Sequence, residues 1–206
     1  QAKDLVNQGI NELVVISQDT TRYGEDLENV NIVTLLKELL KIKELDYIRL
    51  LYLYPDEITD ELIELIGKEE RLTPYFDIPI QHASSKVLKA MNRRGDEAFL
   101  RNLFTKIRNK VPNAILRTTL IVGFPGETEE DFNELCEFIE EMRFERMGCF
   151  AYSEEEGTPA AKLDGMLDPE IRADRADIIN ERQNVILDEI NDSLVGKTLK
   201  TIVEGY

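Results

Sequence analysis

Apolar positions along this chain alternate between short runs and helical stripes. Short apolar or β-branched runs, which predict strands, occupy residues 12–17, 47–53, 75–80, 114–122 and 147–152. Between these runs, apolar residues recur every three or four positions. That spacing predicts helices over residues 33–42, 59–66, 84–91, 96–110, 128–142 and 168 to about 194. Repeated strand–helix units predict an α/β fold with a parallel sheet.

The connections narrow the architecture. No Gly-x-Gly-x-x-Gly motif follows the first predicted strand, which disfavours a dinucleotide-binding fold. An incomplete TIM-type (β/α) barrel remains, as an open parallel sheet with outer helices. In that architecture the carboxyl ends of the strands form one working edge.

The most informative segment runs from Ile115 to Phe132. Ile115–Val122 predicts a strand that is covered on both faces. Gly123 and Gly126 then allow a tight turn and a close approach to a ligand. Thr128 is expected to cap the next helix, with Asp131 completing a capping box. Two interpretations stay open: a ligand site at the turn, or an ordinary strand–helix connection.

Polar, aromatic and glycine residues follow every predicted strand. They stand at 18–24, 54–57, 81–84, 123–127 and 153–158. Because the carboxyl ends of parallel strands meet at one edge of a sheet, these residues should converge there. Connections alone do not need so many of them, so the sequence predicts a functional edge.

Arg117 is a cation inside an otherwise apolar strand. A buried guanidinium requires an anionic partner. One hypothesis is the carboxylate or phosphate of a ligand, held by a bidentate contact. The other is a structural salt bridge to an acidic residue on a neighbouring strand, such as Asp77.

Other polar candidates are less specific. Gln18 and Asp19 follow the first strand and are candidates to bind a ligand amine or hydroxyl, although the spacing favours a cap or turn for Asp19. His82 is the only histidine, which disfavours a metal site in this chain and favours a packed or surface side chain. Glu154–Glu156 fits a solvated loop better than a cation site.

Composition limits the class of protein. The chain has 206 residues, with 42% hydrophobic and 32% charged residues, as is typical of one globular domain. It has no apolar run long enough to cross a membrane and no secretory signal. Cys136 and Cys149 lie in patterned segments and are expected to be small core residues, which suits a reducing, cytoplasmic compartment.

The charge is strongly acidic. Lys and Arg number 25 and Asp and Glu number 41, for a net charge of −16. This disfavours nucleic-acid binding, which needs basic residues. Acidity that serves solubility and acidity that attracts a basic partner both stay open.

Four segments together resemble the radical S-adenosylmethionine methylthiotransferases. They are Gln18-Asp-Thr-Thr-Arg-Tyr-Gly24, Pro79-Ile-Gln-His-Ala-Ser84, Arg117-Thr-Thr-Leu-Ile-Val-Gly-Phe-Pro-Gly-Glu-Thr128 and Phe150-Ala-Tyr-Ser-Glu-Glu-Glu-Gly-Thr158. Within the family, the first two segments are most similar to enzymes that methylthiolate an aspartate of a small-subunit ribosomal protein. The resemblance covers nearly the whole chain. It implies a radical-type partial barrel over residues 1–194 and the first strand of a TRAM domain over residues 195–206.

The resemblance also implies cofactors and a reaction. The family adds a methylthio group to the β-carbon of the aspartate, using S-adenosylmethionine and two [4Fe-4S] clusters in the full-length protein. The family's Cys-x-x-x-Cys-x-x-Cys motif is missing from this sequence. We therefore expect no cluster to be ligated by this chain, the motif to lie upstream of Gln1, and the chain alone to be inactive. The chain starts inside a helical pattern without Met, which also predicts a longer protein.

Carried over residue by residue, the resemblance implies a site. The residues expected to bind S-adenosylmethionine are Gln18, Asp19, Gln81, Arg117, Gly123, Phe124, Pro125, Phe150 and Tyr152. The residues expected to face a basic ribosomal-protein substrate are Arg22, Tyr23, Glu154, Glu155 and Glu156. No catalytic residue is implied, and no membrane partner is expected.

Two alternatives remain. A transfer-RNA adenosine methylthiotransferase shares the glycine-proline motif, but we expect Gln-Asn and Gln-Ser-Gly-Ser in place of Gln18-Asp19 and Gln81-His-Ala-Ser84 in that class. A non-catalytic TIM-like binding module would lack the cluster cysteines altogether. The sequence upstream of Gln1 separates this alternative from an enzyme.

Overall fold

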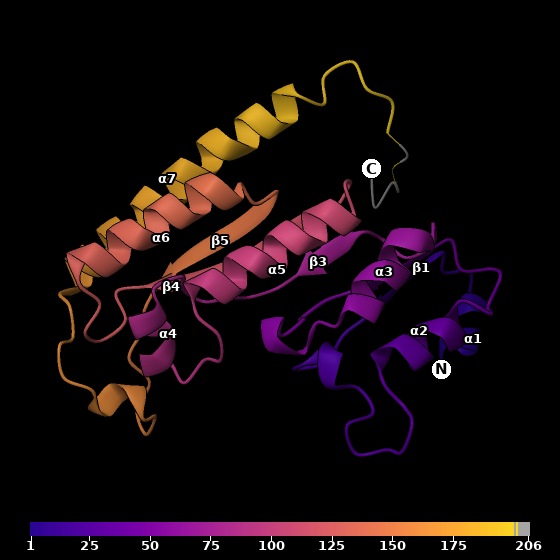
Figure 1. Cartoon of the computed structure of the whole chain (residues 1–206), viewed down its shortest axis with the longest axis horizontal. Coiled ribbons are helices and arrows are strands. Elements are labelled where there is room, and N and C mark those ends of the chain that lie inside the picture. Colours follow the sequence, from indigo (N-terminus) through magenta and orange to yellow (C-terminus); the bar gives the residue numbers. More distant parts are fainter. Residues whose placement is uncertain (200, 202–206) are drawn as a thin grey trace.

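The computed structural model describes residues 1–199 and residue 201. Helices and strands alternate along the chain, as predicted (Figure 1). The helices are α1 (Ala2–Val6), α2 (Ile32–Leu39), α3 (Asp60–Lys68), α4 (Ser85–Ala90), α5 (Glu97–Lys110), α6 (Glu129–Met142) and α7 (Pro169–Asp192). The strands are β1 (Glu12–Val15), β2 (Tyr47–Leu50), β3 (Tyr75–Asp77), β4 (Ile115–Val122) and β5 (Arg146–Ala151).

All strand pairs in the described residues are parallel. β1 pairs with β2, and β3, β4 and β5 form a second group in that order. The two groups are joined by a bridge between Ile48 and Leu72 and by a hydrogen bond from the Leu53 amide to the Asp77 carbonyl, 2.8 Å long. The strands therefore follow chain order in an open arrangement, and the described residues form no closed barrel. This confirms the predicted α/β fold.

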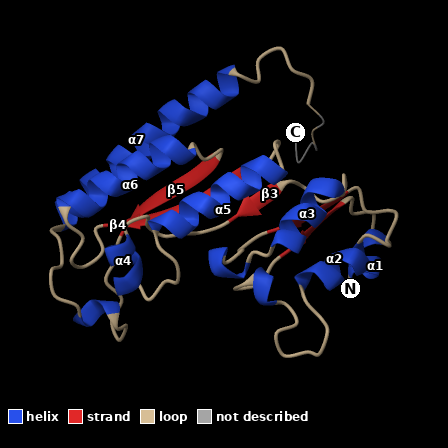
Figure 2. Ribbon diagram, viewed as in Figure 1, coloured by secondary structure: helices blue, strands red, loops and turns tan. Residues whose placement is uncertain are grey.

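Helices cover one face of the sheet. Figure 2 shows α2, α3, α5 and α6 in a row across it, with Leu36, Leu62, Phe104 and Phe138 in the core beneath them. The opposite face is only partly covered. Along β4, the even-numbered residues are buried, whereas Arg117 and the other odd-numbered residues are only partly buried. The prediction that β4 is covered on both faces is wrong, since the open barrel leaves its inner face without a cover.

Helix starts follow the sequence signals. The Thr59 side chain accepts a hydrogen bond from the Leu62 amide at the start of α3. At α6, the Thr128 hydroxyl accepts from the Asp131 amide, and the Asp131 carboxylate accepts from the Thr128 amide. The predicted capping box of Thr128 and Asp131 is confirmed, and it holds the turn after β4 at the start of α6.

The long helix α7 lies along the sheet edge formed by β5, beside α6 (Figure 1). The Asn180 side chain donates to the Cys149 carbonyl and accepts from the Cys149 amide, both at 3.1 Å. An unpaired strand edge exposes backbone donors and acceptors. Asn180, on the neighbouring helix α7, satisfies the backbone donor and the backbone acceptor of one edge residue, Cys149.

The end of the chain leaves one prediction open. Residues 195–199 form a turn and an irregular segment. Most of the predicted TRAM strand at 195–206 lies outside the described residues. In the part of the chain that the structure describes, no helix has the length and apolar character to cross a membrane.

Candidate functional site

A cavity of about 480 Å³ lies beyond the carboxyl ends of β3, β4 and β5. Its lining includes three residues of the predicted cofactor site: Gln81, Phe124 and Tyr152. Residues from α4 and from the loops at 91–93 and 158–160 complete it. The predicted convergence of strand ends on one edge is thus present in part.

The backbone at Gln81 is unusual. Its φ is 73°, in the left-handed region that non-glycine residues rarely adopt. The strand partner holds it there, because the Gln81 amide donates to the Thr119 carbonyl at 3.0 Å and its carbonyl accepts from the Ile121 amide at 2.7 Å. Such backbone conformations persist where surrounding structure enforces them and cluster at functional sites. This conformation lies four residues beyond the end of β3, at an isolated bridge to Leu120, and Gln81 lines the cavity there.

The cavity wall is aromatic with isolated polar atoms. The rings of Phe124 and Tyr152 meet edge to face, with centroids 5.2 Å apart. The Tyr152 hydroxyl and Arg93 Nη1 are both buried and lack a hydrogen-bond partner in the protein. Buried polar atoms normally have partners, so this wall suits a ligand that combines a flat apolar part with polar groups.

Arg117 forms a salt bridge with Asp77, with Nη1 2.5 Å from Oδ1. This matches the structural hypothesis for Arg117, although its side chain remains 39% exposed on the open face of the sheet. Burial lowers the pKa of the Arg117 guanidinium, but the hydrogen bond and charge of Asp77 outweigh it and raise that pKa overall. Arg117 does not line the 480 Å³ cavity.

The segment after β1 is organised by Asp19. Its carboxylate accepts from the Thr21 amide at 3.1 Å and lies 3.0 Å from Arg22 Nε. This confirms the cap or turn favoured for Asp19. Gln18 and Tyr23 are exposed, and neither lines the 480 Å³ cavity.

The glycine-proline turn is tight, as predicted, with φ of 73° at Gly123 and 81° at Gly126. The close approach that glycine allows at this turn is to another part of the protein. A Cβ at Gly123 would lie 2.3 Å from Cγ of Arg172. Pro125 is buried, and neither Gly123 nor Pro125 lines the cavity.

The remaining predicted site residues are exposed. Phe150 lies on the open face of β5 with 60% of its surface accessible. Glu154–Glu156 forms an exposed loop, and within the described residues none of its carboxylates forms a salt bridge. The three carboxylates of this loop therefore lack a salt-bridge partner, in the segment that leads to Thr158 in the cavity lining.

A buried ionic group was missed by sequence reasoning. The Glu127 carboxylate is fully buried, 2.5 Å from Arg175 Nη1, 3.4 Å from His82 Nε2 and 2.8 Å from the Gly123 amide. Burial raises the pKa of Glu127, but these partners outweigh it and hold that pKa below its usual range. His82 Nδ1 accepts from the Ser84 amide, so Nε2 carries the proton and faces Glu127. His82 is packed, which was one of the two placements favoured for it.

The described residues do not fit an iron–sulfur cluster. They contain no group of three His, Cys, Asp or Glu side chains that could hold a metal ion. Cys136 and Cys149 are buried core residues, as predicted. Burial raises the pKa of both thiols, that of Cys149 to about 12, whereas ligation requires thiolates.

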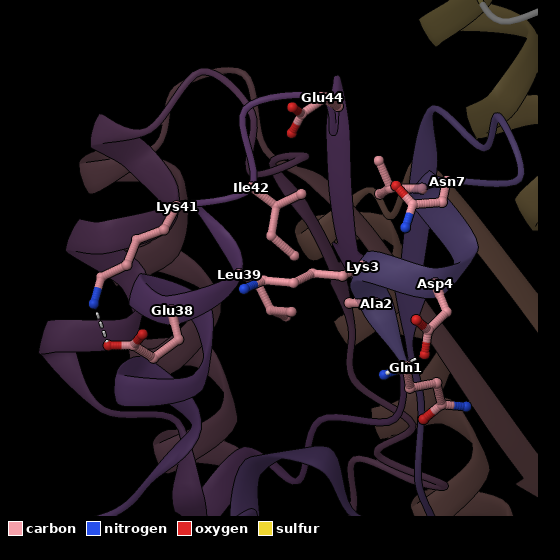
Figure 3. A pocket seen from close by; sticks show the side chains of 11 residues that line it. Gln1, Ala2, Lys3, Asp4, Asn7, Glu38, Leu39, Lys41, Ile42 and Glu44 are labelled. Carbon is pink, nitrogen blue, oxygen red and sulfur yellow. Dashed lines mark hydrogen bonds and ion pairs between the residues drawn. The ribbon is translucent and has the colours of Figure 1, made fainter.

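A larger cavity of about 840 Å³ lies elsewhere, between α1 and the end of α2 (Figure 3). It is lined by Lys3, Glu38 and Lys41 among others, and the figure shows Lys41 turned toward Glu38. None of the predicted site residues lies there. Its lining residues precede β1 and β2 in the chain, so this cavity is not at the carboxyl ends of the strands.

Known proteins are similar to this chain in sequence or in fold. The profile of the radical SAM superfamily matches residues 1–139. The protein named "Ribosomal protein uS12 methylthiotransferase RimO" is 50% identical in Alkaliphilus oremlandii and 45% identical in Aquifex aeolicus, over 100% of this chain and 47% and 48% of those proteins. The structure of the radical S-adenosylmethionine methyltransferase TsrM from Kitasatospora setae, with cobalamin and a [4Fe-4S] cluster bound, aligns with a TM-score of 0.56 at 15% identity. It covers 72% of this chain and 29% of that one.

The chain belongs to the radical SAM superfamily, since the profile match covers well over half of it. Within the superfamily, its similarity at 45–50% identity is to uS12 methylthiotransferases named RimO. The chain spans about half the length of these curated relatives. The likeness to TsrM supports the fold alone.

Proposed function

We propose that this chain is the radical S-adenosylmethionine domain of a methylthiotransferase that modifies an aspartate of ribosomal protein uS12 at its β-carbon. The observation that carries the proposal is the identity of 45–50% to such enzymes over the full length of the chain. The substrate is a ribosomal protein, so we also propose a cytoplasmic location.

S-adenosylmethionine is the cofactor that fits the cavity. Phe124 and Tyr152 offer an aromatic wall for the adenine, and Gln81 offers an amide to a polar group of the ligand. When bound, this cofactor supplies radical chemistry. Arg117 and Phe150, on the open face of the sheet, and Gln18, Asp19, Gly123 and Pro125 remain proposed contacts outside the cavity wall.

Iron–sulfur ligands are proposed to come from other segments. Cys136 and Cys149 do not fit a cluster, for the reasons of burial and thiol pKa given above. The two [4Fe-4S] clusters of the proposed full-length enzyme therefore need cysteines outside residues 1–206.

The proposed substrate surface is acidic. The exposed loop Glu154–Glu156 borders the cavity, and Arg22 and Tyr23 lie on the loop after β1, on the same strand-end edge. With a net charge of −16, this surface favours a basic protein over transfer RNA.

One experiment tests the proposal. The protein is expressed with every segment that its reading frame encodes, reconstituted anaerobically with iron and sulfide, and assayed with S-adenosylmethionine. A uS12 peptide, the same peptide with Asn at the target aspartate, and transfer RNA are offered side by side. Mass spectrometry should find a methylthio adduct only on the aspartate peptide. An adduct only on the RNA would replace the proposal with the transfer-RNA alternative, and no adduct on any substrate would refute it.

A further inference from the structure

The loop at residues 91–95 borders two cavities at once. It connects α4 to α5, and its residues Met91, Asn92 and Arg93 line both the 480 Å³ cavity and a neighbouring cavity of about 410 Å³. The second cavity also contains Arg22, Tyr54 and Asp56. This loop therefore separates the proposed cofactor cavity from the region of Arg22, which is proposed to face the substrate.

The loop's backbone is fixed by a Schellman motif. The Arg93 amide donates to the Leu88 carbonyl at 2.8 Å, and the Asn92 amide donates to the Lys89 carbonyl at 3.1 Å. Asn92 has a φ of 54°, the left-handed conformation this helix ending requires. These backbone hydrogen bonds, and not contacts of the Arg93 side chain, therefore fix the direction of the chain where it leaves α4.

Arg93 lacks an anionic partner. Its guanidinium lies over the Tyr54 ring, with Cζ 5.0 Å from the centroid. Its Nη1 is buried without a hydrogen-bond partner, and no carboxylate in the described residues lies within 4.0 Å of its charged nitrogens. A buried donor without a partner costs stability, so this arrangement suits a group that arrives with a ligand.

Three other arginines near the strand ends already have carboxylate partners. Arg22 lies 3.2 Å from Glu57, Arg94 lies 3.4 Å from Asp56, and Arg175 lies 2.5 Å from Glu127. Asp56 and Glu57, which contact this loop through Arg94, are both held by Arg22 or Arg94. Their charge is therefore partly neutralised, which leaves the Arg93 guanidinium attractive to an incoming anion.

We propose that Arg93 binds a carboxylate of one of the two reaction partners, the methionyl carboxylate of S-adenosylmethionine or the target aspartate of the protein substrate. This inference rests on the proposed function. A guanidinium presents two parallel N–H donors to a carboxylate, and Tyr54 holds its plane from one side. Arg93 is a positioning group for that carboxylate.

Binding measurements test the inference and separate the two sources. S-adenosylmethionine is titrated by calorimetry into the reconstituted full-length protein, and the Asp and Asn forms of the uS12 peptide are titrated by fluorescence anisotropy. The variants are Arg93→Ala, Arg93→Lys and the distant control Arg182→Ala. Loss of a charge-assisted bidentate contact should weaken binding about 10- to 100-fold. Arg93→Lys, which keeps the charge and loses the fork, should fall between.

Each outcome decides the question. Weaker binding of S-adenosylmethionine by Arg93→Ala assigns the carboxylate to the cofactor. Loss of preference for the Asp over the Asn peptide assigns it to the substrate. Unchanged cofactor affinity and unchanged peptide preference, in a variant with wild-type circular dichroism, overturn the inference. If the wild type binds and modifies no peptide, the proposed function fails while the cofactor titration still tests Arg93, and an unchanged dissociation constant there overturns the inference as well.

Discussion

Glu127 is a buried carboxylate with one partner in its own turn and two partners from distant parts of the chain. His82 follows β3, Gly123 follows β4, and Arg175 belongs to α7. Glu127 thus ties the turn after β4, which borders the proposed cofactor cavity, to the helix that covers the sheet edge. The sequence pattern includes this glutamate in the glycine-proline motif but indicates no role for it, because two of its three partners lie 45 and 48 residues away.

Removing the Glu127 charge should destabilise the fold. Glu127→Gln leaves the Arg175 guanidinium, only 8% exposed, without its buried partner, and loss of one member of a buried pair costs about 3–5 kcal/mol. Chemical denaturation should show this loss in the free energy of unfolding. The control is Glu129→Gln, which removes the exposed partner of Arg175 and should cost less than about 1 kcal/mol. Equal losses in both variants would mean that the burial of Glu127 is irrelevant.

The same pair predicts a dependence on pH. The folded pKa of Glu127 is lowered, so the stability it contributes is complete above its unfolded pKa of about 4.3 and is lost as the pH falls through the folded value. The difference in unfolding free energy between wild type and Glu127→Gln should be constant above about pH 5 and shrink below it. A difference that stays constant down to pH 3 would contradict the lowered pKa.

At the scale of elements, the sequence predicted order and type well, because apolar periodicity is a local property. Three strands were predicted too long, since β1, β2 and β3 end at Val15, Leu50 and Asp77. After β2, Tyr52 adopts a positive φ and leaves the regular strand geometry. After β3, the Thr118 hydroxyl donates to the Ile78 carbonyl and accepts from the Ile80 amide, so a side chain replaces the backbone ladder there. The family resemblance proposed Gln81, Phe124 and Tyr152 for the cofactor site, and the strand-end pattern also selected Gln81 and Phe124. Arg93 was missed because it follows a helix, and only the tertiary fold brings that loop to the strand ends.

The contact between α7 and β5 gives a prediction at this scale. Asn180→Ala removes two hydrogen bonds to Cys149, which should lower the free energy of unfolding by about 1–3 kcal/mol. Asn191→Ala, an exposed position near the end of the same helix, is the control, because it has the same change in helix propensity. Thermal denaturation of both variants measures the difference. Equal melting temperatures would show that Asn180 contributes nothing to the edge.

At the scale of the whole molecule, charge is the dominant feature. The net charge of −16 includes the unpaired loop Glu154–Glu156 beside the cavity. Neutralising the loop with three Glu→Gln changes should slow association with the basic uS12 peptide at least ~3-fold at low ionic strength. The effect should fade near physiological salt, where charges are screened over about 8 Å. Stopped-flow fluorescence at several salt concentrations measures the rates.

A matched control separates local from global charge. The same three changes at Glu44, Glu69 and Glu70 alter the net charge equally, on exposed residues outside the strand-end loops. These residues should affect the association rate less. Equal slowing by both triple variants would mean that only the total charge matters.

The division of the sheet between β2 and β3 has a mechanical consequence. Within the described residues, three backbone hydrogen bonds cross that seam, two at the bridge between Ile48 and Leu72 and one from Leu53 to Asp77, whereas β4 and β5 are in register over six residue pairs. A protein opens first where fewest backbone bonds must break together. The Leu53 amide should therefore exchange with deuterium before the amides in the middle of β4. The half that holds β1 and β2 would then move as a rigid body relative to the other half. That other half carries most of the proposed cofactor cavity.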